Sequence, residues 1–440
     1  MYKKRRCEGS SESRRNLAVF SVINPSSKAR VTDNALELHS NAIPVACSER
    51  KRASDRWILS EFTDFVCYIA LEKSQCRRSS RLGSSPAKGD ALALVYACKI
   101  LSYKGVERGV LMGEPKVYFG YRTALQILRT TNPDNRVIVR NAGCRLPERA
   151  PGKAELAAVL ERLRSAHRRI LVDSPVHVLV GEDSHRRLSS DCIEHVSSVT
   201  PVGQSFYRLG KGIYSAAPAL ALIHIAAREK SLVALQELAF ELCGTYQTRR
   251  TGVASAYNVV PLASVRGLRR YIANNTALHG ARKAARALRY VADGSASPRE
   301  TKQALVLGLP FMYGGCGLGV PRMNYEVRAS PVARAITGKS SFRCDLCWPE
   351  AKLDVEYQSR ESHEGEAHRI SDSRRTNALA SMGWTVVCVS NDELDSVAAT
   401  DTIADTIRCH LGKHARVRVS DYHARKLRLR RQLGLPARYE

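Results

Sequence analysis

The sequence contains no long uninterrupted apolar run. Its longest apolar stretch, Ala216 to Ala227, includes Pro218 and His224 and is shorter than the roughly 20 residues that a membrane-spanning helix needs. No apolar segment follows the basic start MYKKRRCEGSSESRR, so the pattern of a secretory signal is absent. We therefore expect a cytoplasmic protein without a membrane partner.

The sequence also has few acidic residues, and its cysteines have no regular spacing. The 440 residues include 42 Asp and Glu against 69 Lys and Arg, which gives a formal charge of +27 and favours a polyanionic partner, nucleic acid first. The 13 cysteines are odd in number and follow no repeating spacing. This usage predicts reduced thiols rather than a disulfide framework.

The chain is long enough for more than one domain, and 44% of its residues are apolar. We expect a basic, poorly patterned N-terminal region over residues 1–111, in which 79–90 (SSRLGSSPAKGD) indicates a loop. A helix-rich scaffold or binding domain follows over 112–292. A further domain covers 293–412, and a basic tail covers 413–440. The expected fold class is α/β (α+β).

The middle segment is typical of amphipathic helices with a few short strands. Glycines and apolar residues over 206–214 predict a hairpin, and the other expected elements are a strand over 176–180 and helices over 155–169, 218–227, 231–242 and 276–291. Basic residues could contact phosphate here or form a solvated helix face: Arg266, Arg269, Arg270, Arg282, Lys283, Arg286 and Arg289.

Residues 341–359 predict a β-hairpin. SFRCDLCW over 341–348 and LDVEYQS over 353–359 both alternate in polarity around the turn 349–352. If that turn is a four-residue loop, Trp348 faces Leu353 and Asp345 faces Glu356. Directly opposed side chains share a face, with Cβ atoms about 5 Å apart.

Two carboxylates opposed in this way repel each other unless a cation lies between them. Carboxylate and carbonyl oxygens are the hard ligands that Mg²⁺ prefers. The hairpin therefore predicts a site for Mg²⁺, or Mn²⁺, formed by Asp345, Glu356 and the backbone carbonyl of Tyr357.

These residues and those that follow resemble the PD-(D/E)XK nuclease superfamily, and most closely its DUF559 and very-short-patch-repair-like endonuclease domains. The resemblance covers residues 297–412 and includes Asp345, the run Glu356-Tyr-Gln358, His363, Asp372-x-x-Arg375 and the segment GWTVVCV over 383–389. It implies a restriction-endonuclease-like αβββαβ core and Mg²⁺-dependent hydrolysis of phosphodiester bonds in DNA. Glu300, Asp345, Glu356, Gln358 and His363 match its catalytic positions.

Gln358 occupies the place that usually holds lysine. It can orient a water molecule but supplies no positive charge, so a catalytically inactive, DNA-binding or regulatory protein is the alternative, for example an antitoxin-like protein of a phage-defence or toxin–antitoxin system. A homodimer or a partner protein of a defence or mobile-element system would then be the protein partner. A scaffold associated with RNA or the ribosome is a further alternative.

Glu300 also has a local structural interpretation. Ser297-Pro298-Arg299-Glu300 is typical of a helix start with a capping box. Cys344-x-x-Cys347 lacks a second ligand pair at zinc-finger spacing, so an ordinary strand is favoured, with the two thiols on opposite faces. GGCGLG over 314–319 lacks the Gly-Lys-Ser/Thr ending of a phosphate loop and predicts a connector.

Basic side chains near the C-terminus complete the expected nucleic-acid surface. Helices are predicted over 371–382 and 393–411, with a buried strand over 385–390 between them. Residues 413–440 contain nine Lys or Arg against two acids. The expected nucleic-acid contacts are Arg374 and Arg375, followed by Arg425, Lys426, Arg428, Arg430 and Arg431 of the basic tail.

Overall fold

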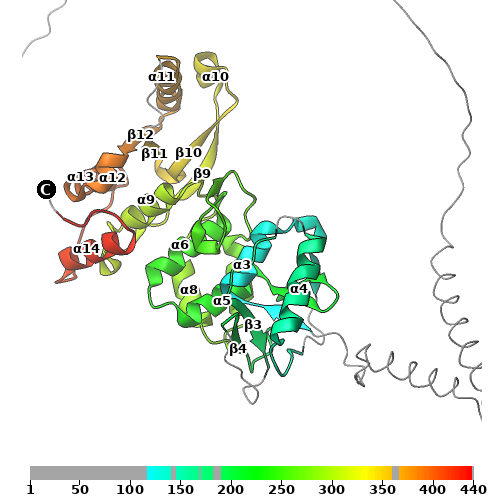
Figure 1. Cartoon of the computed structure of the whole chain (residues 1–440). Coiled ribbons are helices and arrows are strands. Elements are labelled where there is room, and N and C mark those ends of the chain that lie inside the picture. Colours follow the sequence, from blue (N-terminus) through cyan, green and yellow to red (C-terminus); the bar gives the residue numbers. More distant parts are fainter. Residues whose placement is uncertain (1–115, 140–144, 168–169, 182–189, 359–365, 439–440) are drawn as a thin grey trace, which may run out of the picture. The chain divides into compact units, whose positions relative to one another are not determined.

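The structure is a computed structural model that describes residues 116–139, 145–167, 170–181, 190–358 and 366–438 (Figure 1). Residues Arg108–Glu440 form one compact unit. The N-terminal region predicted over 1–111 lies outside the described residues. In the part of the chain that is described, no helix has both the length and the apolar character needed to cross a membrane.

The first half of the described chain contains a mixed six-stranded sheet in the order β2-β5-β6-β1-β3-β4. The predicted strand 176–180 and hairpin 206–214 account for three of its six strands, and the other three were not predicted. The strands are β1 (Val117–Phe119), β2 (Val137–Val139), β3 (Val176–Val180), β4 (Cys192–Val196), β5 (Phe206–Gly210) and β6 (Ile213–Ala216).

Helices account for most of the remaining regular structure in this half. Four of the six lie where the apolar periodicity predicts them, whereas the helices over Tyr121–Thr130 and Val265–Ala273 were not predicted. β7 (Tyr246–Gln247) and β8 (Ala256–Tyr257) add a two-stranded ribbon. The helices are α3 (Tyr121–Thr130), α4 (Lys153–Ala166), α5 (Pro218–Arg228), α6 (Leu232–Cys243), α7 (Val265–Ala273) and α8 (Ala281–Leu288), with short 3₁₀ turns at Pro133–Asn135 and Arg249–Thr251.

The C-terminal half contains a four-stranded sheet in the order β12-β11-β10-β9. β9, β10 and β11 are antiparallel to their neighbours, and β12 runs parallel to β11. The predicted strand bounds are confirmed for β10 and β12, whereas β9 was not predicted. The strands are β9 (Arg322–Arg328), β10 (Ser341–Trp348), β11 (Leu353–Gln358) and β12 (Thr385–Ser390).

Helices pack on both faces of this sheet, so the α/β class is confirmed. Leu346, Val355 and Val389 belong to the same buried cluster as side chains of α9 and α13. On the other face, Phe342 packs with side chains of α10 and α11. The helices are α9 (Pro298–Gly308), α10 (Pro331–Thr337), α11 (Glu366–Ser381), α12 (Asn391–Asp395), α13 (Val397–His410) and α14 (Tyr422–Gln432), with 3₁₀ turns at Phe311–Tyr313 and Pro349–Ala351.

The two halves share one hydrophobic core, although the sequence predicted a boundary near residue 292. The largest buried cluster includes Leu222 of α5, Phe240 of α6, Leu305 of α9 and Leu353 of β11. Buried hydroxyls also join the halves, because the Tyr246 and Thr301 oxygens lie 2.9 Å apart. This continuity fixes α9, and with it Glu300, against the preceding domain.

The basic C-terminal helix α14 packs into the fold instead of lying exposed. Arg430 is 1% exposed and donates hydrogen bonds to the backbone carbonyls of Leu394 (2.8 Å) and Asp395 (2.6 Å). Lys426 is also buried and lies 2.7 Å from the Asp401 carboxylate. The prediction that Lys426 and Arg430 contact nucleic acid is therefore wrong, because their charged groups are satisfied inside the protein.

Three further basic side chains of α14 differ in their surroundings. Arg425 is half-buried and donates to the Asp421 carboxylate and to the Met312 carbonyl. Arg428 and Arg431 are exposed. The exposed basic surface that the tail can offer is therefore smaller than its sequence indicates.

We predict that Arg430→Ala lowers the free energy of unfolding by about 2–4 kcal/mol, because several buried carbonyls lose a charged donor. Arg431→Ala is the matched control. It removes the same charge from an exposed neighbour and is expected to change stability by less than about 0.5 kcal/mol. Urea denaturation measures both variants. Equal stability of the two would contradict the structural role of Arg430.

Candidate metal centre

Four carboxyl groups gather where α9, β10 and β11 meet. Glu300 lies in the first turn of α9, Asp345 in β10, and Asp354 and Glu356 two residues apart in β11. The β10–β11 ladder pairs Trp348 with Leu353, Cys347 with Asp354 and Leu346 with Val355. This is the register that a four-residue turn predicts, and it confirms the sequence-based alignment of the two strands up to Leu346.

The expected direct pairing of Asp345 with Glu356 is not part of that ladder. Instead, the Tyr357 N–H donates a 3.0 Å hydrogen bond to Asp345 Oδ2. The irregularity has a cause in the neighbouring strand, where Asn324 adopts a left-handed backbone conformation with φ of 48°. The β9–β10 pairs on either side of it are Cys344 with Tyr325 and Leu346 with Met323.

At this position, β9 and β10 each switch from packing against one hydrophobic cluster to packing against the other. Cys344 and Tyr325 pack on the α10 and α11 side, whereas Leu346 and Met323 pack with α9 on the other side. Strict alternation would keep Cys344 and Leu346 on one face. The break leaves Asp345 at the change of face, where it interacts electrostatically with both Glu300 and Glu356.

Asn324 connects this break to α9. Its Nδ2 donates to Glu300 Oε2 (2.8 Å) and to the Gly294 carbonyl (2.9 Å), and its Oδ1 accepts from Arg343 Nε (2.7 Å). Glu300 Oε2 also accepts from the Ala296 N–H at 2.9 Å. The Ser297 cap is confirmed, since its hydroxyl accepts from the Glu300 N–H. Glu300 is thus both a helix-start residue and a neighbour of Asp345.

Arg375 of α11 supplies the principal positive charge to the other two carboxylates. Its guanidinium contacts Glu356 Oε1, lies 3.4 Å from Asp354 Oδ2 and donates to the Arg343 carbonyl at 2.8 Å. Of the two α11 arginines predicted to contact nucleic acid, Arg375 instead contacts carboxylates of the protein, whereas Arg374 is exposed.

One positive charge does not balance this group of carboxyls, and their pKa values rise. Burial, and then repulsion by Glu356, raises the pKa of Asp345 to about 6. Burial chiefly raises the pKa of Asp354 to about 7. The pKa of Glu356 rises to about 8, by burial and then by its contact with Asp354. Burial and Asp345 also raise the pKa of Glu300. Without a further cation, the cluster retains protons near neutral pH.

The residues present fit a divalent cation. Their carboxylate oxygens are hard ligands, and Asp354 Oδ1 is a buried oxygen without a hydrogen-bond partner in a side chain that is 0% exposed. An additional cation would relieve the repulsion that raises these pKa values. The proposed Mg²⁺ ligands Asp345 and Glu356 are electrostatically coupled, and Tyr357 lies directly after Glu356.

The other two predicted site residues are Gln358 and His363. Gln358 ends β11, is half-buried and follows Glu356 by two residues, so it shares that strand face. His363 lies outside the described residues. Gln358 therefore lies on the same strand face as Glu356, as the sequence alternation predicts. The role of His363 stays a prediction.

The two cysteines of β10 do not lie on opposite faces, which corrects the sequence-based expectation. Cys344 and Cys347 belong to the same buried cluster, and a hydrogen bond with Cys347 and then burial raise the pKa of the Cys344 thiol. The change of face at Asp345 explains this, because it shifts Cys344 to the side that Cys347 occupies.

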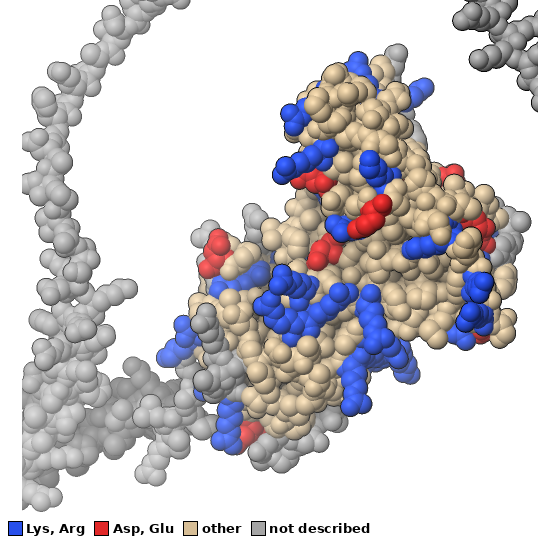
Figure 2. Space-filling view, turned by 180° about the vertical axis from the view of Figure 1, so that it is seen from behind, with Lys and Arg blue, Asp and Glu red and all other residues tan. Residues whose placement is uncertain are grey.

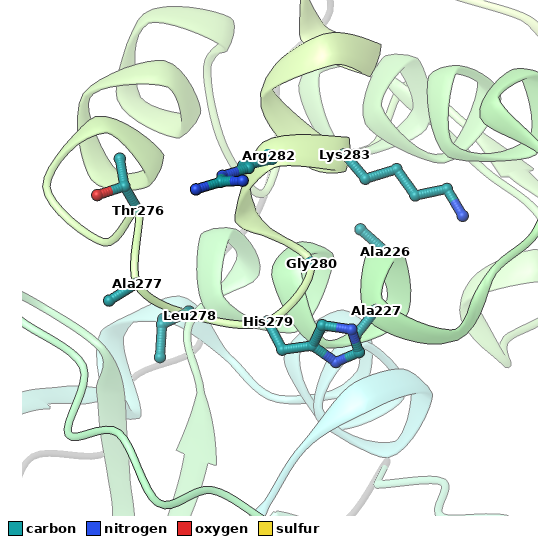
Figure 3. A pocket seen from close by; sticks show the side chains of 9 residues that line it. All are labelled: Ala226, Ala227, Thr276, Ala277, Leu278, His279, Gly280, Arg282 and Lys283. Carbon is teal, nitrogen blue, oxygen red and sulfur yellow. The ribbon is translucent and has the colours of Figure 1, made fainter.

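Two of the basic residues predicted in the middle segment, Arg282 and Lys283, line a separate, open pocket of about 580 Å³ between the end of α5 and the start of α8. Figure 3 shows Arg282 and Lys283 leaving the start of α8 in opposite directions, with His279 on the preceding loop. Lys283 contacts the Glu229 carbonyl, and Arg269 donates to the Leu288 carbonyl at 2.6 Å. Two of these cations thus bind backbone within the protein.

Basic side chains do not form one uniform field on the described surface. Figure 2 shows Lys and Arg in clusters on one face, with Asp and Glu side chains among them. Ion pairs account for several of these, such as Arg322 with Glu350 (3.0 Å) and Arg299 with Asp395 (2.7 Å). In the described part of the chain, the basic side chains therefore lie in separate patches.

Comparison with known proteins finds two similar sequences. They are uncharacterized proteins from two strains of Mycobacterium tuberculosis, each 31% identical over 136 residues, which is 30% of this chain. The match covers 46% of the length of each relative, so this chain spans about half of either. No family model matches the sequence, and no solved structure matches the fold.

Sequence reasoning missed Asp354 and Asn324 as members of the site. The sequence pattern could have identified Asp354, because the alternation of β11 places it on one face with Glu356 and Gln358. The sequence indicates the role of Asn324 more weakly. Asparagine is among the few residues that adopt the left-handed conformation readily, but the neighbouring residues do not indicate that Asn324 contacts Glu300.

We predict that the metal-free protein becomes less stable as the pH rises from about 4.5 to 8. The folded state then holds protons, on carboxyls with raised pKa values, that the unfolded chain has already released. Glu356→Gln removes the carboxyl with a pKa of about 8, so the loss of stability over this range should shrink by about 1–3 kcal/mol.

The measurement is urea denaturation in chelator at about pH 5, 6.5 and 8. Glu350→Gln, an exposed acid in the turn between β10 and β11, is the control and should keep the wild-type pH dependence. An identical dependence in Glu356→Gln would show that the Glu356 carboxyl is not perturbed.

Proposed function

We propose that this protein is a divalent-cation-dependent endonuclease that hydrolyses phosphodiester bonds in DNA. The observation that carries the proposal is the electrostatic coupling of Asp345 to both Glu300 and Glu356, and these three residues come from the first helix and from the second and third strands of an α–β–β–β–α–β arrangement. The resemblance of residues 297–412 to PD-(D/E)XK nucleases assigns these three residues to the metal face, and the geometry supports that assignment.

The chemistry that Mg²⁺ or Mn²⁺ supplies at such a site is polarisation of the scissile phosphate and a lowered pKa of the attacking water. Asp345 and Glu356 hold the ion in this proposal, together with the Tyr357 carbonyl. Tyr357 also fixes Asp345 through its N–H. Asn324 and the Ala296 N–H orient Glu300 toward the same region.

Gln358 and Arg375 have different parts in this proposal. The Gln358 amide orients the attacking water by hydrogen bonding, because it carries no charge with which to activate it. Arg375 holds the Glu356 carboxylate in position. Glu356 presents its remaining oxygen to the metal, and Arg375 thereby acts as a positioning residue.

We predict that supercoiled DNA is nicked or cut in Mg²⁺ or Mn²⁺ and that Glu356→Ala lowers the rate at least about 100-fold, as expected when a metal ligand is removed. Asp345→Asn should have a comparable effect. Glu350→Gln removes a carboxylate from the same hairpin at an exposed position and should retain wild-type activity. Conversion of supercoiled to relaxed and linear DNA, followed on gels, measures all four proteins.

Two results would refute the catalytic proposal: no cleavage by the wild type in either metal, or equal cleavage by the wild type and Glu356→Ala. DNA binding without cleavage is the second candidate function. It is favoured by Gln358 in the lysine position and by the ion pair of Arg375 with Glu356, which neutralises one of the proposed metal ligands.

We predict, for either function, that Arg374→Ala weakens DNA binding and lowers the slope of log affinity against log salt by about one, because one phosphate contact is lost. Arg374 is exposed on α11 and directly precedes Arg375 in the sequence. Arg164→Ala, on the exposed surface of α4, should leave the slope unchanged. Fluorescence anisotropy over a salt series measures this. An unchanged slope in Arg374→Ala would remove this residue from the binding surface.

A further inference from the structure

A thiol lies beside the carboxylates on the α11 face of the sheet. The Cys344 sulfur and one carboxylate oxygen each of Asp354 and Glu356 all lie within 4.8 Å of one another. Cys344 and Asp354 are each 0% exposed. The group includes neither Asp345 nor Glu300 within that distance in the described part of the chain, so it differs from the proposed Mg²⁺ site and shares only Glu356 with it.

Asp354 gives independent evidence that this group lacks a ligand. Its Oδ2 lies 3.4 Å from Arg375, and its Oδ1 has no nitrogen or hydroxyl donor although the side chain is fully buried. The other polar neighbours of this carboxyl are Cys344 and Glu356, the remaining members of the group. A buried carboxylate oxygen without a partner costs roughly 1–3 kcal/mol or more. A cation bound to Oδ1 would remove that cost.

We propose that Cys344, Asp354 and Glu356 form a binding site for a thiophilic divalent metal such as Zn²⁺, with Cys347 as the fourth ligand. The set contains sulfur, which Mg²⁺ does not prefer, together with the carboxylate oxygens that zinc also accepts. Cys347 belongs to the same buried cluster as Cys344 and hydrogen-bonds with it.

The dimensions of the group suit zinc after a small contraction. Zinc bonds of about 2.0–2.3 Å place neighbouring ligands of a tetrahedral site roughly 3.3–3.8 Å apart, whereas the three ligand atoms here lie within 4.8 Å. Asp354 and Glu356 are both in the regular part of β11, so we expect rotation of their side chains to supply this contraction.

Charge also favours the metal. When the Cys344 thiolate and both carboxylates are ionised, they carry three negative charges against the single positive charge of Arg375. A coordinating thiol is deprotonated by the metal itself, so Cys347 adds a fourth negative charge when it binds. A divalent cation then lowers the net charge of the four ligands and Arg375 from −3 to −1. Arg375 keeps its contacts to Asp354 Oδ2 and Glu356 Oε1, which leaves one oxygen of each carboxylate for the ion.

The site goes beyond the proposed nuclease function, because it can be occupied whether or not the protein cleaves DNA. Where both sites exist, they compete for Glu356. Zinc bound at Cys344 would then withdraw Glu356 from the Mg²⁺ ligands and inhibit cleavage.

The experiment uses the full-length, reduced protein and Co²⁺ as a spectroscopic substitute for Zn²⁺. We expect one equivalent of Co²⁺ to give a near-ultraviolet thiolate-to-cobalt band, and Zn²⁺ to displace it. Cys344→Ser should lose the band and bind Co²⁺ at least tenfold more weakly. Cys409→Ser removes an exposed thiol and should retain both. A wild type without the band, or a Cys344→Ser protein with an unchanged band, would overturn the proposal.

Two further proteins keep the result interpretable. Asp354→Asn is expected to weaken Co²⁺ binding while it retains every thiol, which tests the site if Cys344→Ser does not fold. Asp345→Asn should lose DNA cleavage and retain the cobalt band. A band without cleavage in the wild type would thus reject the nuclease function alone, and cleavage without a band would reject the thiolate site alone. X-ray absorption of the wild-type zinc complex should show sulfur at about 2.3 Å, and a shell of oxygen and nitrogen only would contradict the site.

Discussion

The contact of Arg375 with Asp354 and Glu356 is the interaction on which the candidate site depends. Without it, β11 would present two largely buried carboxylates on one face with no positive partner, which is strongly unfavourable. With it, the carboxyls persist but remain incompletely neutralised, since the pKa values of Asp354 and Glu356 stay near 7 and 8. The negative charge at this place in the sheet is therefore only partly balanced by Arg375.

The position of α11 follows from the same interaction. Ala378 and Leu379 pack its apolar side onto the sheet, and Arg375 lies one turn earlier, above the carboxylates. The same helix, α11, thus provides both the apolar packing against the sheet and the positive charge that pairs with the carboxylates. A change that shifted α11 would alter the packing and the charge balance of the site together.

Local patterns predicted the elements of the C-terminal half well. The bounds of β10 and β12 and the pairing of Trp348 with Leu353 follow from alternation and from the length of one turn. The predicted helix 393–411 is divided into α12 and α13, where Ser396 begins a new cap. These features depend on neighbours in the sequence, so one sequence is enough to specify them.

Features that depend on distant contacts were not predictable in the same way. Arg430 belongs to a basic run that is typical of an exposed helix. Its burial is explained by the carbonyls at the end of α12, the Thr400 hydroxyl and the Pro436 carbonyl, to which it donates hydrogen bonds. The proximity of Cys344 to Asp354 requires the change of face at Asp345, which originates in Asn324 of another strand. Asp345 and Glu356 could be related from the sequence alone, but their actual geometry could not.

Asn324 has a further consequence for how this sheet can vary. β9 and β10 change sides together, so the register of their pairing is the same before and after the step, with Cys344 opposite Tyr325 and Leu346 opposite Met323. One strand pair can therefore contribute side chains to two separate cores without a bulge between its strands. A substitution at Asn324 would accordingly be felt in both cores.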